Sequence, residues 1–468
     1  MNTKPNTKNQ NDKKAVFETM PVPKALTIMA LPTVISQVIV LAYNISDTWF
    51  IGRTDNPYMI GAASLVLALF LSMAALSNLF GVGGGSLMVR LMGRGDIEEA
   101  RKTASYSITM SAIFALGFSL ICLVLMDQIL RLLGASDNTL EYSRQYLLFT
   151  VVIGGLPTVL SLTMPMILRN AGYAREAGIG VSIGGLLNIA LDPIFMFVIL
   201  PDGFQVLGAA LATLISNIIS MLYFIVVYLR IKDKSILQLP KRLEKLRPDS
   251  LKSFYSVGIP AAIILLLFNS VNIVTNRLTV SYGDIPLASV GIVMKVERLP
   301  INIGLGVCLG MVPLVAYSFA KKDFRRMDSI FSTARITILA VAILSMAASF
   351  IFAEPIVNAF INDPETIRLG TEFLKARCLA MPFMIIGFQI VNFMQAVNQG
   401  KTSFLLTIIR HVLLNIPALI IMNMIWGITG LIWAQTVSDI INAVIACIIY
   451  YRVHKSITAP QAEISRKE

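Results

Sequence analysis

Charged residues are scarce in this sequence, and their scarcity excludes most soluble folds. They make up 14% of the 468 residues, whereas 56% are hydrophobic. Soluble domains carry about a quarter charged residues, so an interior this apolar needs lipid as its solvent. The apolar residues form long blocks, and a helix that crosses a bilayer needs about 20 of them. The blocks lack the alternation over about ten residues that a membrane barrel requires. Composition therefore predicts an all-α membrane protein.

Cysteine and histidine are also rare, which argues against a disulfide framework or a metal centre. His411 and His454 are isolated in the sequence, so we expect no bound metal cofactor. The four cysteines lie in apolar runs without motif spacing, as buried thiols do: Cys122, Cys308, Cys378 and Cys447.

Motifs of nucleotide chemistry and catalysis are missing. The glycine-rich run GVGGGS at 81–86 lacks the Gly-Lys-Ser/Thr of a phosphate loop and favours close helix packing. No Walker motif, catalytic triad or metal-ligand spacing occurs. We therefore expect neither an enzyme nor an ATP-driven pump.

Positive charge is abundant, but its distribution argues against nucleic acid as a partner. The net charge is +12, and Lys and Arg gather in alternate loops. This alternation follows the positive-inside rule and predicts an even number of crossings with both termini in the cytoplasm. The first 24 residues have no short apolar core before a cleavage site, so we expect no cleaved signal. We expect a multi-pass protein of a bacterial inner membrane, with the lipid bilayer as its partner.

Twelve apolar segments between charged or Pro/Gly-rich breaks predict twelve membrane-spanning helices. The second and eighth segments are long for one crossing, so tilt or a break is expected there. The predicted spans are 27–52, 58–90, 103–126, 143–168, 177–200, 207–229, 254–281, 286–319, 329–353, 368–395, 402–424 and 427–451.

The two sets of six spans resemble each other at a nearly constant offset of 227 or 228 residues. Leu31-Pro32 matches Ile259-Pro260, and Asp96 matches Asp323. Leu187-Asn188-Ile189 matches Leu414-Asn415-Ile416. Duplicated six-helix halves are a transporter design, with the substrate path between the halves. We predict two pseudo-symmetric lobes.

The predicted domain boundaries follow from this repeat. The cytoplasmic tails are 1–24 and 453–468, the N-lobe is 25–230, the linker is 231–253 and the C-lobe is 254–452.

Acidic residues inside the first half mark a candidate ion site, because charge within a span is costly and usually functional. At about 1.5 Å per residue, Asp47, Asp192 and Thr213 lie roughly 7, 12 and 9 Å from the outer ends of their spans. Asn188 and Tyr43 stand one turn from Asp192 and Asp47. These five side chains can meet at one level of the outer leaflet.

Two carboxylates in a low-dielectric pocket repel each other and favour a shared proton, and the same oxygens suit sodium. Alternatively, Asp192 serves the backbone break at Pro193 and Asp47 faces the headgroups.

The acidic pair belongs to one half only. At the repeat offset, the counterparts of Asp47 and Asp192 are Thr275 and Leu419. The second half has charges of its own: Lys295, Glu297, Arg298, Arg410 and Asp439. These charges form either a self-neutralising network that joins helices or part of the substrate path.

Several motifs together resemble the MATE (multidrug and toxic compound extrusion) family, nearest its DinF- and MepA-like bacterial branch. They are LPTVISQVIVLAYNISDTWFIGR, GVGGGSLMVRLMGRGDIEEAR, MILRNAGYAREA, LLNIALDPIFMF, LGAALATLISN and QAVNQGKTS, and the resemblance covers about 24–452. It implies two six-helix lobes and antiport of organic cations against protons or sodium, with no other cofactor. It also implies a cation site, sodium included, at Asp47, Asn188, Asp192 and Thr213, with Tyr43 beside it.

Two other functions compete with antiport. A flippase for lipids or lipid-linked sugars would need a basic cavity for its anionic cargo, whereas the first half offers acids. A scaffold or receptor has no need of an internal duplication. The predicted partners are therefore small organic cations, and we expect a monomer.

Overall fold

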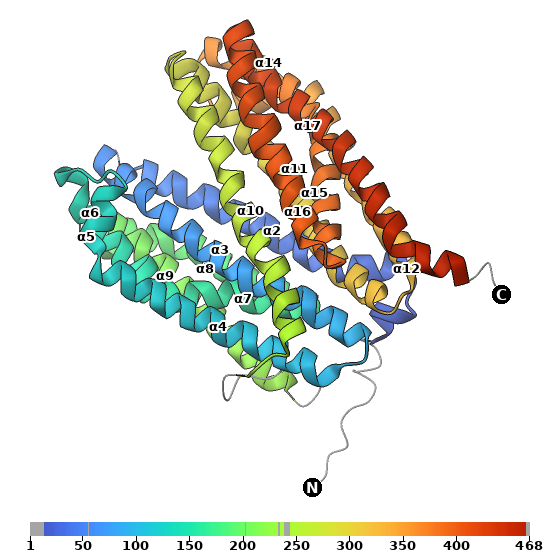
Figure 1. The fold of residues 1–468 in the computed structure, drawn as a ribbon. Coiled ribbons are helices and arrows are strands. Elements are labelled where there is room, and N and C mark those ends of the chain that lie inside the picture. Colours follow the sequence, from blue (N-terminus) through green and yellow to red (C-terminus); the bar gives the residue numbers. More distant parts are fainter. Residues whose placement is uncertain (1–13, 55, 202, 233–234, 238–243, 465–468) are drawn as a thin grey trace. The chain divides into compact units, whose positions relative to one another are not determined.

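The computed structural model describes residues 14–464 except 55, 202, 233–234 and 238–243. Within this part every regular element is a helix and no strand occurs (Figure 1). The predicted tails and linker lie partly outside the described residues, at 1–13, 465–468, 233–234 and 238–243. The all-α prediction is confirmed.

The chain divides into two compact units, Met1–Leu266 and Leu267–Glu468. Helix α10 (Pro248–Val280) begins in the first unit and ends in the second. The other helices of the first unit are α2 (Val22–Gly52), α3 (Pro57–Gly93), α4 (Ile97–Val124), α5 (Met126–Leu132), α6 (Asp137–Leu147), η1 (Leu148–Ile153), α7 (Gly155–Asn170), α8 (Ala174–Ile194), η2 (Phe195–Ile199) and α9 (Gln205–Ile231). Those of the second unit are α11 (Asp284–Ala320), α12 (Phe324–Ile351), α13 (Ala353–Asn358), α14 (Pro364–Cys378), α15 (Met381–Ala396), α16 (Gly400–Ile408), η3 (Ile409–Asn415) and α17 (Ile416–Ile464).

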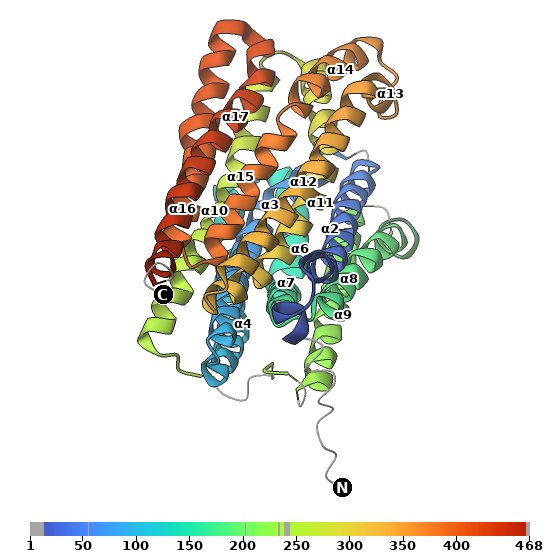
Figure 2. The same cartoon turned by 90° about the vertical axis from the view of Figure 1, so that its right-hand side faces the viewer.

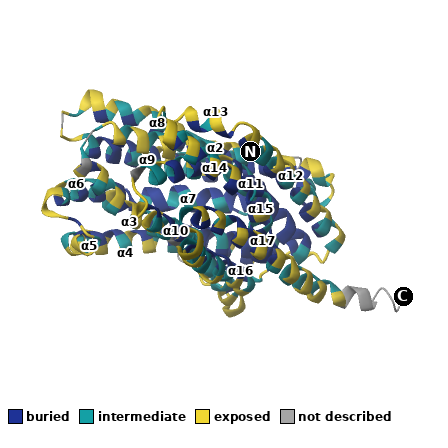
Figure 3. Ribbon diagram, turned by 90° about the horizontal axis from the view of Figure 1, so that it is seen from above, coloured by how far each residue is buried: buried dark blue, intermediate teal, exposed yellow. Residues whose placement is uncertain are grey.

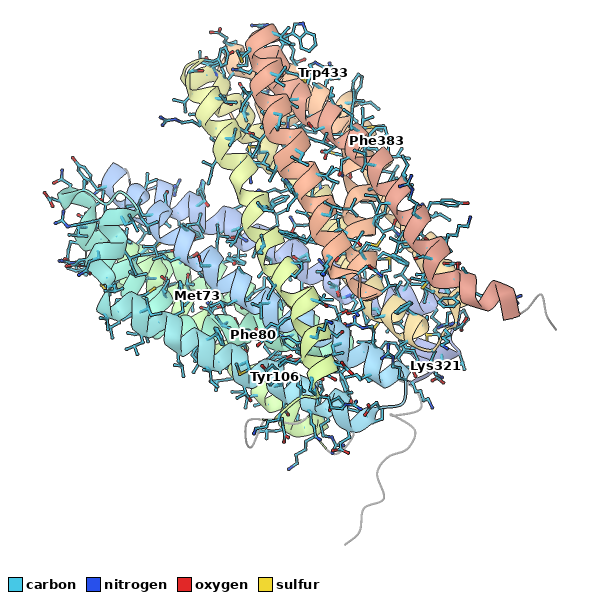
Figure 4. The ribbon with its side chains drawn as sticks, viewed as in Figure 1. Met73, Phe80, Tyr106, Lys321, Phe383 and Trp433 are labelled. Atoms are coloured by element: carbon cyan, nitrogen blue, oxygen red, sulfur yellow. The ribbon has the colours of Figure 1, made fainter. Side chains whose placement is uncertain are left out.

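Aromatic packing holds the first part of α10 in the first unit. The Phe254 ring lies 5.4 Å from the Tyr106 ring and 6.3 Å from the Phe80 ring. Figure 4 shows Phe80 and Tyr106 beside this stretch of α10. A Cβ at Gly83 would stand 2.8 Å from the Phe254 carbonyl oxygen, so only glycine lets α3 and α10 approach this closely. The predicted packing role of the GVGGGS run agrees with this contact.

The helices account for twelve crossings. Nine helices of the described part are long and apolar enough to cross a membrane, and two bent pairs bring the number to eleven. One of the nine, Gly400–Ala459, is broken at Gly427, where φ is +60° and ψ is −140°. Because only glycine adopts such a backbone readily, the chain turns there between the eleventh and twelfth spans. The twelve predicted spans are confirmed.

The breaks within spans lie where prolines follow, not in the long segments. Of the two alternatives predicted for 58–90 and 286–319, tilt or a break, a break does not occur, since α3 and α11 are continuous helices of 37 residues each. The fourth span bends by 50° between Ile153 and Gly155, and the tenth by 46° between Cys378 and Met381. Pro157 and Pro382 follow these bends, and a proline clashes with the carbonyl four residues earlier. Both halves bend at the same place in the repeat.

Equivalent caps begin the third and ninth spans. The Asp96 carboxylate accepts from the Glu99 N–H at 3.3 Å, and that of Asp323 accepts from the Arg326 N–H at 3.0 Å. The residues before them, Gly95 and Lys322, have φ of +80° and +60°. The matched aspartates of the repeat are therefore matched N-caps.

Burial follows the two bundles. Exposed positions lie on their outer faces and buried ones inside (Figure 3). Three cysteines are buried as predicted, but Cys447 is exposed. The prediction for Cys447 is wrong because its face of α17 points out of the bundle, where Val444 and Ile448 are 57% and 50% exposed.

Candidate functional site

Asn188 and Asp192 of α8 form the buried centre of the candidate site in the first unit. Only 4% and 0% of their surfaces are exposed. Asn188 donates from Nδ2 to Asp192 Oδ1 at 3.4 Å and to the Thr213 hydroxyl at 3.3 Å. The Asn188 amide therefore bonds to Asp192, one turn later on the same face of α8, and also links α8 to Thr213 on α9.

Close packing of α2 on α8 brings Asp47 and Tyr43 to this centre (Figure 2). Small residues on α8 allow the approach. A Cβ at Gly185 would stand 2.8 Å from Ile39 Cγ2 and 3.5 Å from Tyr43 Cδ1. Tyr43 and Asp47 stand one turn apart on α2, so both can face the centre.

Electrostatic contacts show how near these groups are to one another. The carboxylate of Asp47 interacts electrostatically with that of Asp192, and both carboxylates interact electrostatically with the Tyr43 hydroxyl. The structure thus brings together all five residues predicted for the ion site, from α2, α8 and α9.

Tyr146 of α6 is a sixth member, which the sequence analysis missed. It interacts electrostatically with Asp47, Asp192 and Tyr43. It also packs on the small cluster of Ile51, Met196 and Ala209. The estimate of depth within a span, which pointed to Thr213, could also have found Tyr146, because Tyr146 lies a few residues inside the outer end of the fourth predicted span.

Unpaired oxygens define what the site can hold. Asp47 Oδ1, Asn188 Oδ1 and Asp192 Oδ2 are buried and have no hydrogen-bond partner among the described residues. Buried acceptors without a donor are costly. A proton or a hard cation such as sodium supplies what these oxygens need. The described residues hold no group of three or more His, Cys, Asp or Glu side chains suited to a metal, so a cation here would also use amide and hydroxyl oxygens.

The backbone is irregular on both sides of the site. The π-helix η2 (Phe195–Ile199) follows Pro193, which lacks the N–H of a regular helix. The π-helix η1 (Leu148–Ile153) begins two residues after Tyr146. Single π-helical turns within α-helices often occur at functional sites.

The second unit has an apolar cluster at the place equivalent to the acidic pair. Leu419, the counterpart of Asp192, is 1% exposed and packs with Val271, Leu431 and Ala434. Thr275, the counterpart of Asp47, donates to the Val271 carbonyl oxygen at 2.9 Å. The chemical difference between the halves is therefore also a difference in packing.

Three of the charges singled out in the second half form buried ion pairs. Glu297 accepts two hydrogen bonds of 2.8 Å from Arg377. Asp439 accepts from Arg410 at 2.8 Å and from Gln435 at 2.7 Å. The sequence analysis did not include Arg377, although a charge inside the tenth span was a sufficient signal.

Lys295 and Arg298 lie apart from these pairs. Both side chains are exposed on α11, and neither forms an ion pair with the described residues. The structure thus separates the five predicted charges into paired and unpaired groups.

Comparison with a family model and with known proteins places this arrangement among multidrug transporters. The model described as MatE matches twice, over residues 32–194 and 260–421. Its two matches begin 228 residues apart, which is the predicted repeat offset. The multidrug export protein MepA of Staphylococcus aureus (strain MRSA252) is 32% identical over 451 residues, covering 96% of this chain and 98% of MepA. MepA of Staphylococcus haemolyticus (strain JCSC1435) is 31% identical over 455 residues, covering 97% and 98%.

Solved structures share the fold at lower identity. A MATE protein in complex with MaL6 is 21% identical, with a TM-score of 0.89 over 96% of this chain and 99% of that one. An outward-facing multidrug resistance MATE transporter of the MOP superfamily has the same identity and TM-score, over 95% and 98%. A MOP superfamily transporter from Pyrococcus furiosus, described as having a binding pocket of reverse polarity, has a TM-score of 0.86. All three have the helical fold found here.

Proposed function

Since this chain belongs to the MatE family, whose fold of twelve spans in two six-helix lobes it has, we propose that it is an antiporter that exports small organic cations in exchange for protons or sodium ions. Its relatives are called multidrug export proteins, and we extend that role to this chain. It acts as a transporter and not as an enzyme, and it needs no cofactor besides the coupling ion.

The observation that carries the proposal is the set of unpaired buried oxygens on Asp47, Asn188 and Asp192. Two carboxylates that act on each other inside a bundle favour a bound cation over two free charges. Thr213 and Tyr43 add a hydroxyl and a phenol at the same place. An exchangeable proton or sodium ion satisfies this set, and the gradient of that ion can drive export.

A flippase for lipids or lipid-linked sugars is the second candidate. An anionic cargo calls for cations along its path, and Lys295 and Arg298 are exposed cations on α11. The acidic cluster of the first unit disfavours an anionic cargo, so we place the antiporter first.

The direct test is transport by purified protein in liposomes. A fluorescent organic cation should move when a proton or a sodium gradient is imposed separately, and one of the two should suffice. Asp192→Asn removes the titratable group with little change in size and should abolish the driven flux. A wild-type protein that moves the cation equally well without either gradient would contradict antiport.

The proposed location is a bacterial inner membrane, with both termini in the cytoplasm and the protein acting as a monomer. Reporter fusions after Asn56 and after Lys245 should report opposite sides of the membrane, because basic loops stay inside. The same side for both fusions would overturn this topology.

A further inference from the structure

We propose that Lys295 and Arg298 form an anion subsite on α11, which binds the carboxylate of zwitterionic cargo. The inference rests on the proposed transport function and names the class of cargo. Neither cation takes part in the buried ion pairs of the second unit, Arg377–Glu297 and Arg410–Asp439.

The two side chains lie on one face of α11, well inside the helix. They follow Asp284, the start of α11, by 11 and 14 residues, which is about 17 and 21 Å along the helix axis. Asn302, one turn after Arg298, donates from its side chain to the Arg298 carbonyl oxygen at 2.7 Å. Residues spaced by three, four and seven share a helix face, so the face carries two cations and an amide.

The neighbouring acid cannot neutralise these cations. Glu297 points away from that face, is 8% exposed, and accepts both of its hydrogen bonds from Arg377. Placing two exposed cations this far inside a span in contact with lipid would cost much free energy, so we infer that they line a water-filled path.

The fold does not need these charges. At the repeat offset of 227, Lys295, Arg298 and Asn302 correspond to Ala68, Leu71 and Ala75 on α3. Helix α3 has the same length as α11 without any of the three polar groups. A role in binding explains why only one half carries them.

The positive charges on this face of α11 favour a ligand with an anionic oxygen group. An organic cation is repelled by Lys295 and Arg298, whereas a carboxylate can accept two parallel hydrogen bonds from the Arg298 guanidinium. A molecule with both a carboxylate and a cationic group remains within the class of organic cations that the proposed antiporter exports.

Two forms of one dye test the subsite. Rhodamine 110 carries a free carboxylate, and rhodamine 123 is its methyl ester. Binding of each to the purified full chain is measured by fluorescence polarisation. The double variant Lys295→Gln/Arg298→Gln should weaken rhodamine 110 binding by about tenfold or more, since it removes charge-assisted hydrogen bonds. Rhodamine 123 should bind the same variant more tightly, because two repelling charges are gone.

Matched variants make the result specific. Arg277→Gln removes another exposed cation of the second unit, on α10, and should change neither affinity by more than about twofold. Arg298→Lys should retain part of the preference for the carboxylate. If the double variant is unstable, Lys295→Gln alone should weaken rhodamine 110 binding by about threefold. Equal effects on both dyes, or no effect on either, would overturn the subsite.

A lipid headgroup is the other source of an anionic group. In nanodiscs, adding phosphatidylglycerol to phosphatidylcholine should leave the preference for rhodamine 110 intact. If the anionic lipid abolishes this preference in wild type, the face binds lipid and the assignment to cargo is wrong. The proposed antiport fails separately, when wild type does not move rhodamine 123 under any ion gradient.

Discussion

The Asn188 side chain donates a hydrogen bond to the Thr213 hydroxyl at 3.3 Å and so links α8 to α9 beside Asp192. The second unit has a related link, since Asn415 donates to Gln435 Oε1 at 2.7 Å. Asn188 and Asn415 are matched in the repeat. Both halves thus retain the amide that joins these two spans, but only the first half places two carboxylates with unpaired oxygens, Asp47 Oδ1 and Asp192 Oδ2, next to it.

This asymmetry predicts unequal effects of substitution. Asp47→Asn or Asp192→Asn should abolish ion-driven export, because an amide neither titrates nor supplies a charged oxygen. Thr275→Ser keeps the hydroxyl that bonds to Val271, and Leu419→Ile keeps the volume of the side chain, so export should stay within about twofold of wild type. Uptake by inverted membrane vesicles, at matched protein levels, measures both. Comparable losses in the two halves would rule out coupling in the first half alone.

Tyr146 should matter as much as the residues found from the sequence. Tyr146→Phe retains the ring that packs on Ile51 and Met196 but removes the hydroxyl near both carboxylates. Because the Tyr146 hydroxyl interacts electrostatically with both carboxylates, its loss should change how they hold an ion, and coupled export should fall. Tyr142→Phe, one turn earlier on α6, is the control. Equal export by the two variants would remove Tyr146 from the site.

The sequence predicted the twelve spans, and it predicted that the five residues of the candidate site lie together, because both depend on local pattern. Hydropathy marks a span, and depth along a helix brings Asp47, Asp192 and Thr213 to one level. The repeat added Asp96 and Asp323, which the structure shows to be matched caps.

Side-chain partners were harder to predict because they depend on packing between helices. No spacing in the sequence shows that Glu297 bonds to Arg377, 80 residues away, and not to the adjacent Lys295 or Arg298. The bends were misplaced for a related reason. Length suggested tilt or a break in α3 and α11, whereas the bends lie after Ile153 and Cys378, shortly before Pro157 and Pro382.

The Glu297–Arg377 pair should stabilise the second unit as a pair. Both side chains are 10% exposed, so Glu297→Gln or Arg377→Gln alone leaves a buried charge and should lower the free energy of unfolding by about 3–5 kcal/mol. The double variant leaves no unpaired charge and should recover much of the loss. Thermal unfolding of the purified wild type, both single variants and the double variant measures these differences in stability. Stable single variants with weak export would instead favour the substrate path.

Asp96 predicts a pH dependence of stability. Its hydrogen bond from Arg247 holds the pKa of the Asp96 carboxyl below its usual range. A lowered pKa stabilises the folded state above the unfolded value, about 4, and this contribution is lost as pH falls through the folded value. Asp96→Asn, which retains a capping side chain, should therefore be less stable than wild type near pH 7 and equal to it at a pH below the folded value. The side chains of Arg247 and Asp96 are 57% and 34% exposed, so the difference is small and shrinks in high salt. A difference that persists in acid would assign the effect to the cap.

Reciprocal binding of ion and cargo is the most demanding prediction. Antiport requires that each ligand disfavour the bound state of the other, and this coupling free energy is the same in both directions. A proton or sodium ion at Asp47 and Asp192 removes the negative charge that attracts an organic cation to the first unit. The affinity of purified protein for the cation should therefore fall as pH drops or as sodium rises, by about fivefold or more.

Asp192→Asn tests this mechanism directly. The variant retains the size of the side chain and an oxygen that can accept from Asn188, but it cannot take up a proton and binds sodium weakly. Its affinity for the cation should be lower than that of wild type and nearly independent of both ions. Leu419→Ile, at the matched position of the second unit, should retain the wild-type dependence. If wild-type affinity is indifferent to pH and to sodium, ion and cargo are not coupled at this site, and passive transport or lipid flipping becomes the better account.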